Sequence, residues 1–356
     1  MNDYKKLYKK TIKEYKEIYK TLDAKNLKCA EGSLRKYQLS VLDFAKTIIS
    51  YIDSLNIPYF PIGGTLIGAI RNRGFVPWDD DFDLGMMRED YNKFLNFCNK
   101  TFKYIPPSLI FFSLDNRSLV WDKYLKKYPN QILYSQTPHH IQLIYGKDIN
   151  NCVNIDIFAH DRYREDLTIK EYKKYVEYLK YKKLSIDNWG KVIEFFNNEI
   201  ENNPIFDKTS KKIFYGPDNI DNYILSIYGF FKEETIFPLK KLPFENIEIN
   251  VQNKEEEFAR LQYSNFMNMP KDIIISSHSN KRKECVNSSI ISKLKRKLYT
   301  VLFKMCTRNI NDFNQFEKFI AIDELQKIIL QNHKTTYKDL YLTTKSKLEF
   351  IKSIKG

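Results

Sequence analysis

The segment GGTLIGAIRNRGFVPWDDDFD, residues 63–83, decides the fold because it joins a glycine pair to closely spaced carboxylates. Within it, Asp81 and Asp83 flank Phe82, and this spacing predicts a strand whose two carboxylates project from one face while Phe82 enters the core. Asp80 would then point inward with Phe82 and matter less. Two like charges held so close favour a cation, and oxygen ligands alone suit a hard divalent ion such as Mg²⁺ or Mn²⁺. Because Mg²⁺ usually completes its octahedron with water and substrate phosphate, the segment predicts a site for phosphoryl transfer.

The glycine pair predicts the phosphate-binding half of this site. Gly63 and Gly64 lack a Cβ, so their backbone can approach a ligand closely. Thr65 is expected to start a helix whose first N–H groups, together with the Thr65 hydroxyl, point at a bound phosphate. Arg71 follows one to two turns later as a further clamp. The segment has neither the Gly-Lys-Ser/Thr ending of a P-loop nor the G-x-G-x-x-G of a dinucleotide fingerprint, so neither loop is indicated.

Two other interpretations fit the acidic run less well. Apolar neighbours such as Trp78 and Met86 argue against a solvated loop, because they place the carboxylates at the mouth of a core. In an EF-hand loop beginning at Asp79, Leu84 would occupy the glycine position and Asp90 the glutamate position. The calcium-loop interpretation therefore fails at two required positions.

The two motifs GGTLIGA at 63–69 and GFVPWDDDFD at 74–83 resemble the LicD family of phosphotransferases. Members of that family carry GGTLLGA followed by a Gly-Phe-Ile-Pro-Trp-Asp-Asp-Asp-hydrophobic-Asp segment. The resemblance covers about residues 34 to 280 and includes FPLKKLPFENIEINV at 237–251. It departs at YSNFMNMP, residues 263–270, where the family tends toward Tyr-Gly-Asp-Tyr-Met before a proline.

The resemblance implies an α+β fold with a nucleotidyltransferase-like mixed sheet core flanked by helices, and apolar residues at helical spacing outside it predict helical N- and C-terminal extensions. It also implies a third acidic residue, since the nucleotidyltransferase superfold, to which the family is similar, completes its metal triad with a further aspartate. Asp156 fits this role, because it stands between Ile155 and Ile157 and faces opposite to both. The expected catalytic and metal-binding residues are thus Asp81, Asp83 and Asp156.

The resemblance further implies a metal-dependent enzyme that transfers a phospho-alcohol group from a CDP-activated donor to a hydroxyl of a cell-surface glycan, lipopolysaccharide or teichoic acid precursor. Phosphocholine from CDP-choline is the expected group, on the resemblance alone. A nucleotidyltransferase acting on an NTP, or a transferase of another CDP-activated alcohol such as ribitol phosphate, would use the same carboxylates. A non-enzymatic basic binding protein is the remaining alternative, and the aspartate triad argues against it, because like charges gathered without a metal destabilise a fold.

Length and composition predict a globular protein with more than one part. The 356 residues, 43% of them hydrophobic, can bury a substantial core, and we expect a catalytic domain at 31–284 between helical extensions at 1–30 and 285–356. The five cysteines form no C-x-x-C pair, which argues against a zinc site and a disulfide framework. The N-terminal MNDYKKLYKK has no apolar h-region, and no apolar run is long enough to cross a bilayer, so we expect a cytoplasmic protein.

The formal net charge of +14 fits anionic partners. Residues 4–22 place tyrosines, isoleucine and leucine at helical spacing among lysines, which predicts a basic amphipathic helix. A second apolar stripe, at 290–305, would pack on the core or lie on a membrane. Peripheral contact with the anionic inner face of a membrane is therefore an expected interaction, and no nucleic acid is expected. The histidines expected to be structural are His139, His140, His160 and His278.

Overall fold

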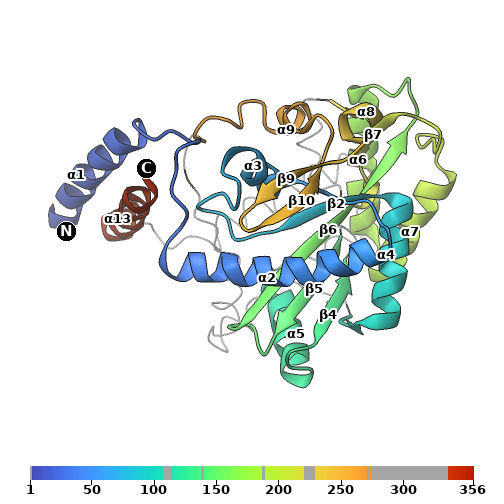
Figure 1. Cartoon of the computed structure of the whole chain (residues 1–356), viewed down its shortest axis with the longest axis horizontal. Coiled ribbons are helices and arrows are strands. Elements are labelled where there is room, and N and C mark those ends of the chain that lie inside the picture. The colour runs from blue at the N-terminus through green and yellow to red at the C-terminus, as the bar shows by residue number, and fades with distance from the viewer. Residues whose placement is uncertain are drawn as a thin grey trace.

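The computed structural model describes residues 2–106, 114–137, 140–186, 189–219, 229–270, 273 and 336–356. Within these residues, eight strands form one mixed sheet that helices cover on both faces, which confirms the expected α+β fold (Figure 1). The strands are β1 (Phe60–Pro61), β2 (Asp83–Met87), β3 (Lys103–Tyr104), β4 (Ile132–Gln136), β5 (Ile141–Gly146), β6 (Cys152–Tyr163), β7 (Lys212–Tyr215) and β8 (Phe231–Lys232). Their order is β1-β2-β6-β5-β4-β3, while β7 pairs with β6 and β8 with β7.

The long strand β6 organises the sheet. It pairs in parallel with β2 and antiparallel with β5 and β7. Its side chains alternate, so that Ile155 and Ile157 are fully buried on one face while Asp156 lies half-buried on the other. The expected orientation of Asp156 is therefore confirmed, and one face of β6 carries apolar residues while the other carries a carboxylate.

The apolar face of β6 is covered by helices α2 (Gly32–Ser54) and α4 (Arg88–Thr101). In α2, Val41, Ala45 and Ile48 recur every three to four residues and are fully buried, which gives the helix one continuous apolar stripe. Together, α2 and α4 enclose the core on this face of the sheet.

Phe82 enters this same core, as its spacing predicts. It is buried and makes edge-to-face contacts with Phe75 and Phe244, at ring-centroid distances of 6.4 Å and 5.4 Å. Phe244 belongs to a hairpin of β9 (Lys240–Phe244) and β10 (Ile247–Val251), which accounts for the predicted segment at 237–251. The buried ring of Phe82 thus anchors the acidic segment to this core.

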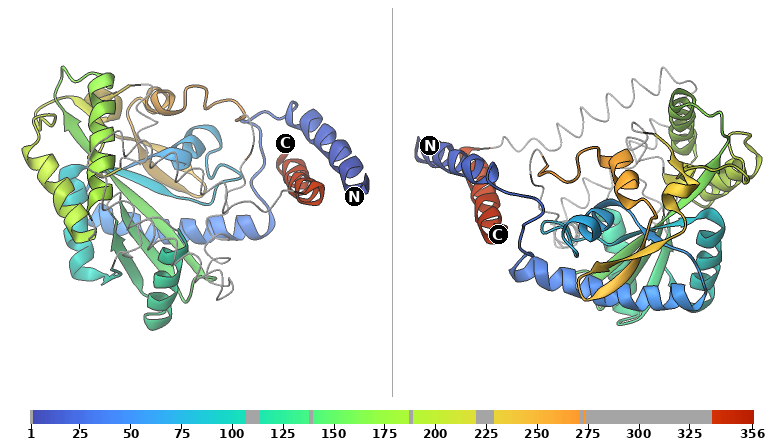
Figure 2. Two further views of the ribbon diagram at one scale, coloured as in Figure 1. Left: turned by 180° about the vertical axis from the view of Figure 1, so that it is seen from behind. Right: turned by 45° about the horizontal axis from the view of Figure 1, so that its top comes forward.

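The opposite face of the sheet carries a second core, and Figure 2 shows from behind the helices that cover this face. The helices that supply side chains to it are α3 (Gly63–Arg71), α6 (Ile169–Ser185), α7 (Trp189–Asn202), α8 (Glu233–Ile236) and α9 (Glu255–Tyr263). Helix α6 begins at a capping box formed by Thr168 and Glu171. Helix α5 (Leu114–Lys127) packs Trp121 and Leu125 on β4 and β5 in a smaller cluster.

Two predicted element boundaries are wrong. The acidic strand starts at Asp83, so Asp81 and Phe82 precede it. The chain turns around Pro77 and Trp78, where the Asp79 N–H donates to the Val76 carbonyl at 2.9 Å, and the paired register with β6 begins only at Asp83. The helix predicted to start at Thr65 starts two residues earlier, because Gly63 adopts a φ of +59° that lets the chain turn directly out of β1.

The two ends of the chain lie side by side, although the sequence analysis treats them as separate extensions. Helix α1 (Asn2–Tyr19), which confirms the basic helix predicted at 4–22, packs against α13 (Tyr337–Ile354) (Figures 1 and 2). The predicted stripe at 290–305 and residues 285–335 of the C-terminal extension lie outside the described residues, as do His139 and His278. None of the helices described has the length and hydropathy needed to span a membrane.

A substitution in α3 tests how tightly this helix is packed. A Cβ added to Gly68 would lie 2.2 Å from the carbonyl oxygen of Gly74, a backbone atom that cannot move alone. We expect Gly68→Ala to cost about 2 kcal/mol of unfolding free energy and to lower the melting temperature by about 5 °C. Gly32→Ala is the control, since a Cβ there would have no heavy atom within 4 Å and only the φ of +63° is unfavourable. We expect this variant to lose about 1 kcal/mol of unfolding free energy. An equal or larger loss for Gly32→Ala would contradict the close packing of α3.

Candidate active site

Asp83 and Asp156 are neighbours across the parallel pair β2–β6. Their Cα atoms are partners in the strand register, and both side chains are half-buried. The next pair, Leu84 and Ile157, is fully buried in the apolar core, so the two carboxylates share the opposite face of the sheet. Neighbouring strands lie about 4.8 Å apart, which brings two predicted metal ligands together on adjacent backbones.

The turn that precedes β2 contributes three further carboxylates. One oxygen from each of Asp79, Asp80 and Asp81 lies within 4.8 Å of the other two. Asp79 and Asp81 are half-buried, whereas Asp80 is only 1% exposed. Asp80, predicted to point inward and to matter less, is indeed buried, but its carboxylate belongs to the same cluster. Asp79 is absent from the predicted site, and the run of three aspartates was the signal that could have identified it.

The glycine pair makes room for these carboxylates at the start of α3. A Cβ on Gly64 would lie 1.8 Å from Oδ2 of Asp79, and a Cβ on Gly63 would lie 3.4 Å from Oδ2 of Asp83. The positive end of the helix dipole therefore lies beside negative side chains, which offsets part of their mutual repulsion. A phosphate bound at these glycines would lie next to the carboxylates. Phosphate binding by the backbone of Gly63 and Gly64 stays a prediction.

Thr65 has a structural contact that the sequence does not indicate. Its side chain is buried, and its Oγ1 accepts a hydrogen bond of 2.9 Å from the backbone N–H of Asp83. The Asp83 carbonyl in turn accepts from the Ile62 N–H at 3.1 Å. Thr65 therefore fixes where β2 begins, while its predicted contact with phosphate stays a prediction.

Arg71 places a buried positive charge at the far end of α3. Its Nη1 donates to the carbonyl of Phe266 at 2.8 Å, its Nε donates to Oδ1 of Asn72 at 3.0 Å, and its guanidinium lies 5.5 Å from the ring centre of Trp78. Burial lowers the pKa of Arg71 to about 10, so it keeps its charge at neutral pH. No carboxylate pairs with it among the residues that the structure describes. This is compatible with a phosphate clamp, which stays a prediction.

Asp156 is held by three side chains that the sequence analysis does not assign to the site. Gln142 Nε2 donates to both of its oxygens, at 3.1 Å and 3.3 Å, and Asn154 Nδ2 donates to Oδ1 at 3.3 Å. Nε2 of His140 lies 3.5 Å from Oδ2. Gln142 is a buried polar residue in the otherwise apolar start of β5. This interruption of an apolar strand is the one feature of the sequence that could have identified Gln142 as a site residue. His140, expected to be structural, thus lies next to a predicted catalytic residue.

Tyr263, at the end of α9, brings a hydroxyl to the same place. Its oxygen would lie 3.7 Å from a Cβ on Gly63. Burial, together with the negative charges of Asp83 and Asp79, raises the pKa of Tyr263 well above its ordinary value. The phenol therefore stays protonated at neutral pH and can act as a hydrogen-bond donor. Tyr263 opens the segment YSNFMNMP, where the sequence departs from the LicD pattern.

His160 has the structural role that the sequence analysis expects. It is fully buried on β6, with its ring 5.0 Å from Phe60 and 4.6 Å from Tyr215. Burial lowers the pKa of His160 to about 3, so the ring is neutral at physiological pH. A neutral imidazole enclosed by aromatic rings is a packing residue here.

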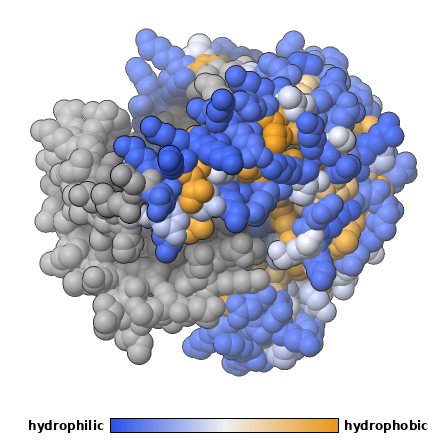
Figure 3. Space-filling model, turned by 90° about the vertical axis from the view of Figure 1, so that its left-hand side faces the viewer, coloured by the Kyte–Doolittle hydropathy of each residue, from blue (hydrophilic) through white to orange (hydrophobic). Residues whose placement is uncertain are grey.

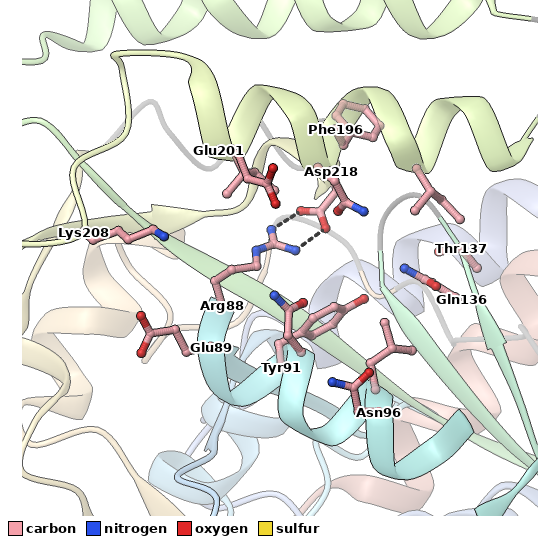
Figure 4. Close-up of a pocket in the computed structure, with 15 residues that line it drawn as sticks. Arg88, Glu89, Tyr91, Asn96, Gln136, Thr137, Phe196, Glu201, Lys208 and Asp218 are labelled. Atoms are coloured by element: carbon pink, nitrogen blue, oxygen red, sulfur yellow. Dashed lines mark hydrogen bonds and ion pairs between the residues drawn. The ribbon is translucent and has the colours of Figure 1, made fainter. Parts of the chain in front are cut away.

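A separate cavity of about 370 Å³ lies between α4 and α7, at the end of β4 (Figure 4). Figure 4 shows Tyr91 and Asn96 on α4 opposite Phe196 and Glu201 on α7, with Arg88 paired to Asp218 between them. None of the clustered aspartates lines this cavity. Thr137 links this cavity to the surroundings of Asp156. It lines the cavity, and its Oγ1 lies 3.4 Å from Nδ1 of His140.

The donor set of the cluster suits a hard divalent cation. Asp79, Asp81, Asp83 and Asp156 offer only oxygen atoms, which is the ligand type that Mg²⁺ and Mn²⁺ prefer. Asp79 and Asp83 each have a carboxylate oxygen beside one of the two glycines that start α3, and Asp156 is the register partner of Asp83. The arrangement can therefore hold a cation next to an anion-binding helix start.

Comparison with known proteins agrees with this geometry. Residues 56–184 match the family described as LicD/FKTN/FKRP, nucleotidyltransferase domain. The lipopolysaccharide cholinephosphotransferase LicD of Haemophilus influenzae is 44% identical over 64 residues, which are 18% of this chain and 24% of that protein. The human ribitol 5-phosphate transferase FKRP is 29% identical over 100 residues, 28% of this chain and 19% of the relative. An uncharacterized protein of Rickettsia prowazekii, RP689, is 37% identical over 79 residues, 22% of this chain and 29% of the relative.

These matches span less than a third of the length of each relative. The family match nevertheless includes the glycine pair, the aspartate turn, the start of β2 and Asp156. Every carboxylate of the candidate site thus falls within the matched residues. Over residues 56–184 this chain is thus similar to the nucleotidyltransferase domain of the LicD/FKTN/FKRP family.

Proposed function

We propose that this protein transfers a phospho-alcohol group from a CDP-activated donor to a hydroxyl of a cell-surface glycan, lipopolysaccharide or teichoic acid precursor. The observation that carries the proposal is the pairing of Asp83 with Asp156 on adjacent parallel strands, beside the glycine-rich start of α3. Two relatives are named as transferases of phosphocholine and ribitol 5-phosphate. Because the identity is higher to the first, phosphocholine from CDP-choline is the group that we propose.

In this proposal, Asp81, Asp83 and Asp156 would hold Mg²⁺ or Mn²⁺. A bound divalent ion would neutralise charge on the donor diphosphate, which is the main requirement of phosphoryl transfer. The backbone N–H groups at Gly63 and Gly64 would bind phosphate oxygens, and Arg71 would add a positive charge behind them. Asp79 is a further ligand candidate from the same turn.

Asp156 would also orient the acceptor. Hydrogen bonds from Gln142 and Asn154 fix its carboxylate, so it could accept the proton of an acceptor hydroxyl in a defined direction. The protonated Tyr263 could donate to an oxygen of the transferring group. On the acceptor side, we assign the cavity between α4 and α7 to the glycan, since its exposed amides Asn92 and Asn96 suit hydroxyl groups.

A second candidate uses the same carboxylates. The matched family is described as a nucleotidyltransferase domain, and such an enzyme would attack the α-phosphate of an NTP. Incubation with a panel of CDP-alcohols and NTPs plus Mg²⁺ separates the two candidates, because the first releases CMP and the second releases pyrophosphate. We place the protein in the cytoplasm, with peripheral contact at the inner membrane face, where activated donors and lipid-borne acceptors would meet.

Asparagine substitutions test the carboxylates. Asp81→Asn, Asp83→Asn and Asp156→Asn each remove the charge of a ligand while keeping its volume. We expect turnover to fall by about a thousandfold or more, because a metal supplies several kcal/mol of transition-state stabilisation, with the metal-free melting temperature unchanged or raised. The exposed Asp53→Asn on α2 is the control. Normal turnover in any of the three site variants with Mg²⁺ present would remove that residue from the site.

Thermal shift measures whether metal and donor bind together. We expect Mg²⁺ to raise the melting temperature more in the presence of CDP-choline than alone, since the ion uses donor phosphates as ligands. Asp83→Asn should abolish the extra shift. Equal shifts with and without the nucleotide would indicate a structural ion and would contradict the proposed role.

The support of Asp156 can be tested separately. Gln142→Leu keeps a buried side chain of similar size but removes the donor to both carboxylate oxygens. We expect kcat/KM and the affinity for Mg²⁺ to fall about 10- to 100-fold. Ser135→Ala is the matched control, because Ser135 is the Cα partner of Gln142 on β4 and is buried in the same row of the sheet. A Gln142→Leu enzyme with wild-type kinetics would show that Asp156 needs no such support.

A further inference from the structure

The helices α1 and α13 form a parallel pair at one edge of the molecule. Near their N-terminal ends, the rings of Tyr4 and Tyr341 lie 6.0 Å apart. Farther along, Lys352 forms an ion pair of 2.5 Å with Glu14. Residue numbers rise together along both helices, so the first turns of both helices point the same way, and Figure 1 shows the pair beside the body of the protein.

The first turns of this pair expose apolar side chains. Among the residues described, eight large hydrophobic side chains are exposed, and four of them belong to these two helices. They are Tyr4 at 38%, Leu7 at 42%, Tyr337 at 40% and Leu342 at 49%. We call these four residues, with the lysines around them, the α1/α13 tip. Such a concentration of exposed apolar groups is not needed for the packing of the pair, whose own buried contacts lie at Tyr15, Leu348 and Ile351.

Lysines surround the apolar side chains of the tip. Lys5 lies 5.5 Å from the ring centre of Tyr337, and Lys338 lies 6.0 Å from that of Tyr4. Between residues 3 and 10 and between 337 and 345, six lysines face only two aspartates in the sequence. Figure 3, which views the molecule from this side, shows a mainly hydrophilic surface with hydrophobic residues between the polar ones. The tip thus combines positive charge with apolar side chains that can leave water.

We propose that the α1/α13 tip binds the surface of an anionic lipid membrane. Leu7 and Leu342 would enter the boundary between headgroups and acyl chains, the tyrosines would lie at the headgroup level, and the lysines would contact lipid phosphates. A nucleic acid would satisfy the lysines but gives the exposed leucines no partner, so the observations favour the membrane. This gives the peripheral contact proposed above a definite location.

The tip is connected to the active site through packed side chains. Trp78, which immediately precedes the aspartate turn, packs on the cluster of Tyr15 and Leu348. The Lys28 N–H donates to the carbonyl of Ile354 at 2.9 Å, which ties the end of α13 to the segment that leads into α2. A membrane bound at the tip would therefore have a defined position relative to the carboxylates, as a lipid-borne acceptor requires.

Vesicle binding by the full chain tests the tip without relying on enzymatic activity. We expect the protein to sediment with vesicles of phosphatidylcholine mixed with phosphatidylglycerol, to bind much less to phosphatidylcholine alone, and to be released by salt. The double variant Leu7→Ser/Leu342→Ser should lose binding by about tenfold or more. The control is Leu39→Ser on α2, which removes a leucine of similar exposure, 41%, outside the tip.

The lysine variant Lys5→Gln/Lys6→Gln/Lys9→Gln should lose both binding and salt dependence. If it alone loses binding while the leucine variant binds like the wild type, the surface recognises charge only, as for a nucleic acid, and the proposal is wrong. Absence of binding by the full chain overturns it as well. Leu342→Trp provides a check that needs no loss of function, because its fluorescence should shift to the blue only with vesicles that contain phosphatidylglycerol. CMP release from a soluble acceptor should be unchanged in all tip variants, which separates this proposal from the proposed transfer reaction.

Discussion

The hydrogen bond from the Asp83 N–H to the Thr65 hydroxyl is the contact on which the candidate site depends. It joins the first turn of α3 to the first residue of β2, and the Ile62 N–H bonds the Asp83 carbonyl from the other side. With its backbone fixed in this way, Asp83 enters the parallel register opposite Asp156. A shift of one residue would turn the carboxylate into the apolar core and bring Phe82 or Leu84 out of it. The position of the charge is therefore set by backbone contacts and by burial of its neighbours.

The glycine pair leaves the space that the carboxylates of the site need. Gly64 leaves the space that Asp79 occupies, and Gly63 leaves space near Asp83 and Tyr263. Crowded carboxylates repel one another, and the helix start, with its partial positive charge, is a favourable neighbour for them. A cation would complete this balance and would let phosphate oxygens share the same helix start. The carboxylates are thus concentrated beside the start of α3, where a cation and an anion could bind next to each other.

The residues of the candidate site lie partly inside and partly outside the range that matches the family. Residues 56–184 contain all the aspartates of the site. Two residues beyond that range also contribute: Tyr263 supplies a phenol, and the carbonyl of Phe266 accepts a hydrogen bond from Arg71. The α1/α13 pair lies outside the matched range as well. Side chains that surround the candidate site therefore come from segments far apart in the chain. The contact through Trp78 joins the two terminal helices to the aspartate turn.

The sequence by itself determined the acidic motif, the burial of Phe82, the face of the strand on which Asp156 lies, and the helices at residues 4–22 and after the glycine pair. These features depend on local periodicity, which reports which face a residue occupies. Only the tertiary structure decided that β2 starts at Asp83, that Thr65 bonds a backbone N–H, and that Gln142, Asn154 and His140 surround Asp156. It also decided that α1 packs on α13. Periodicity cannot name a partner on another strand or at the other end of the chain, because those contacts are selected by the packing of the whole fold.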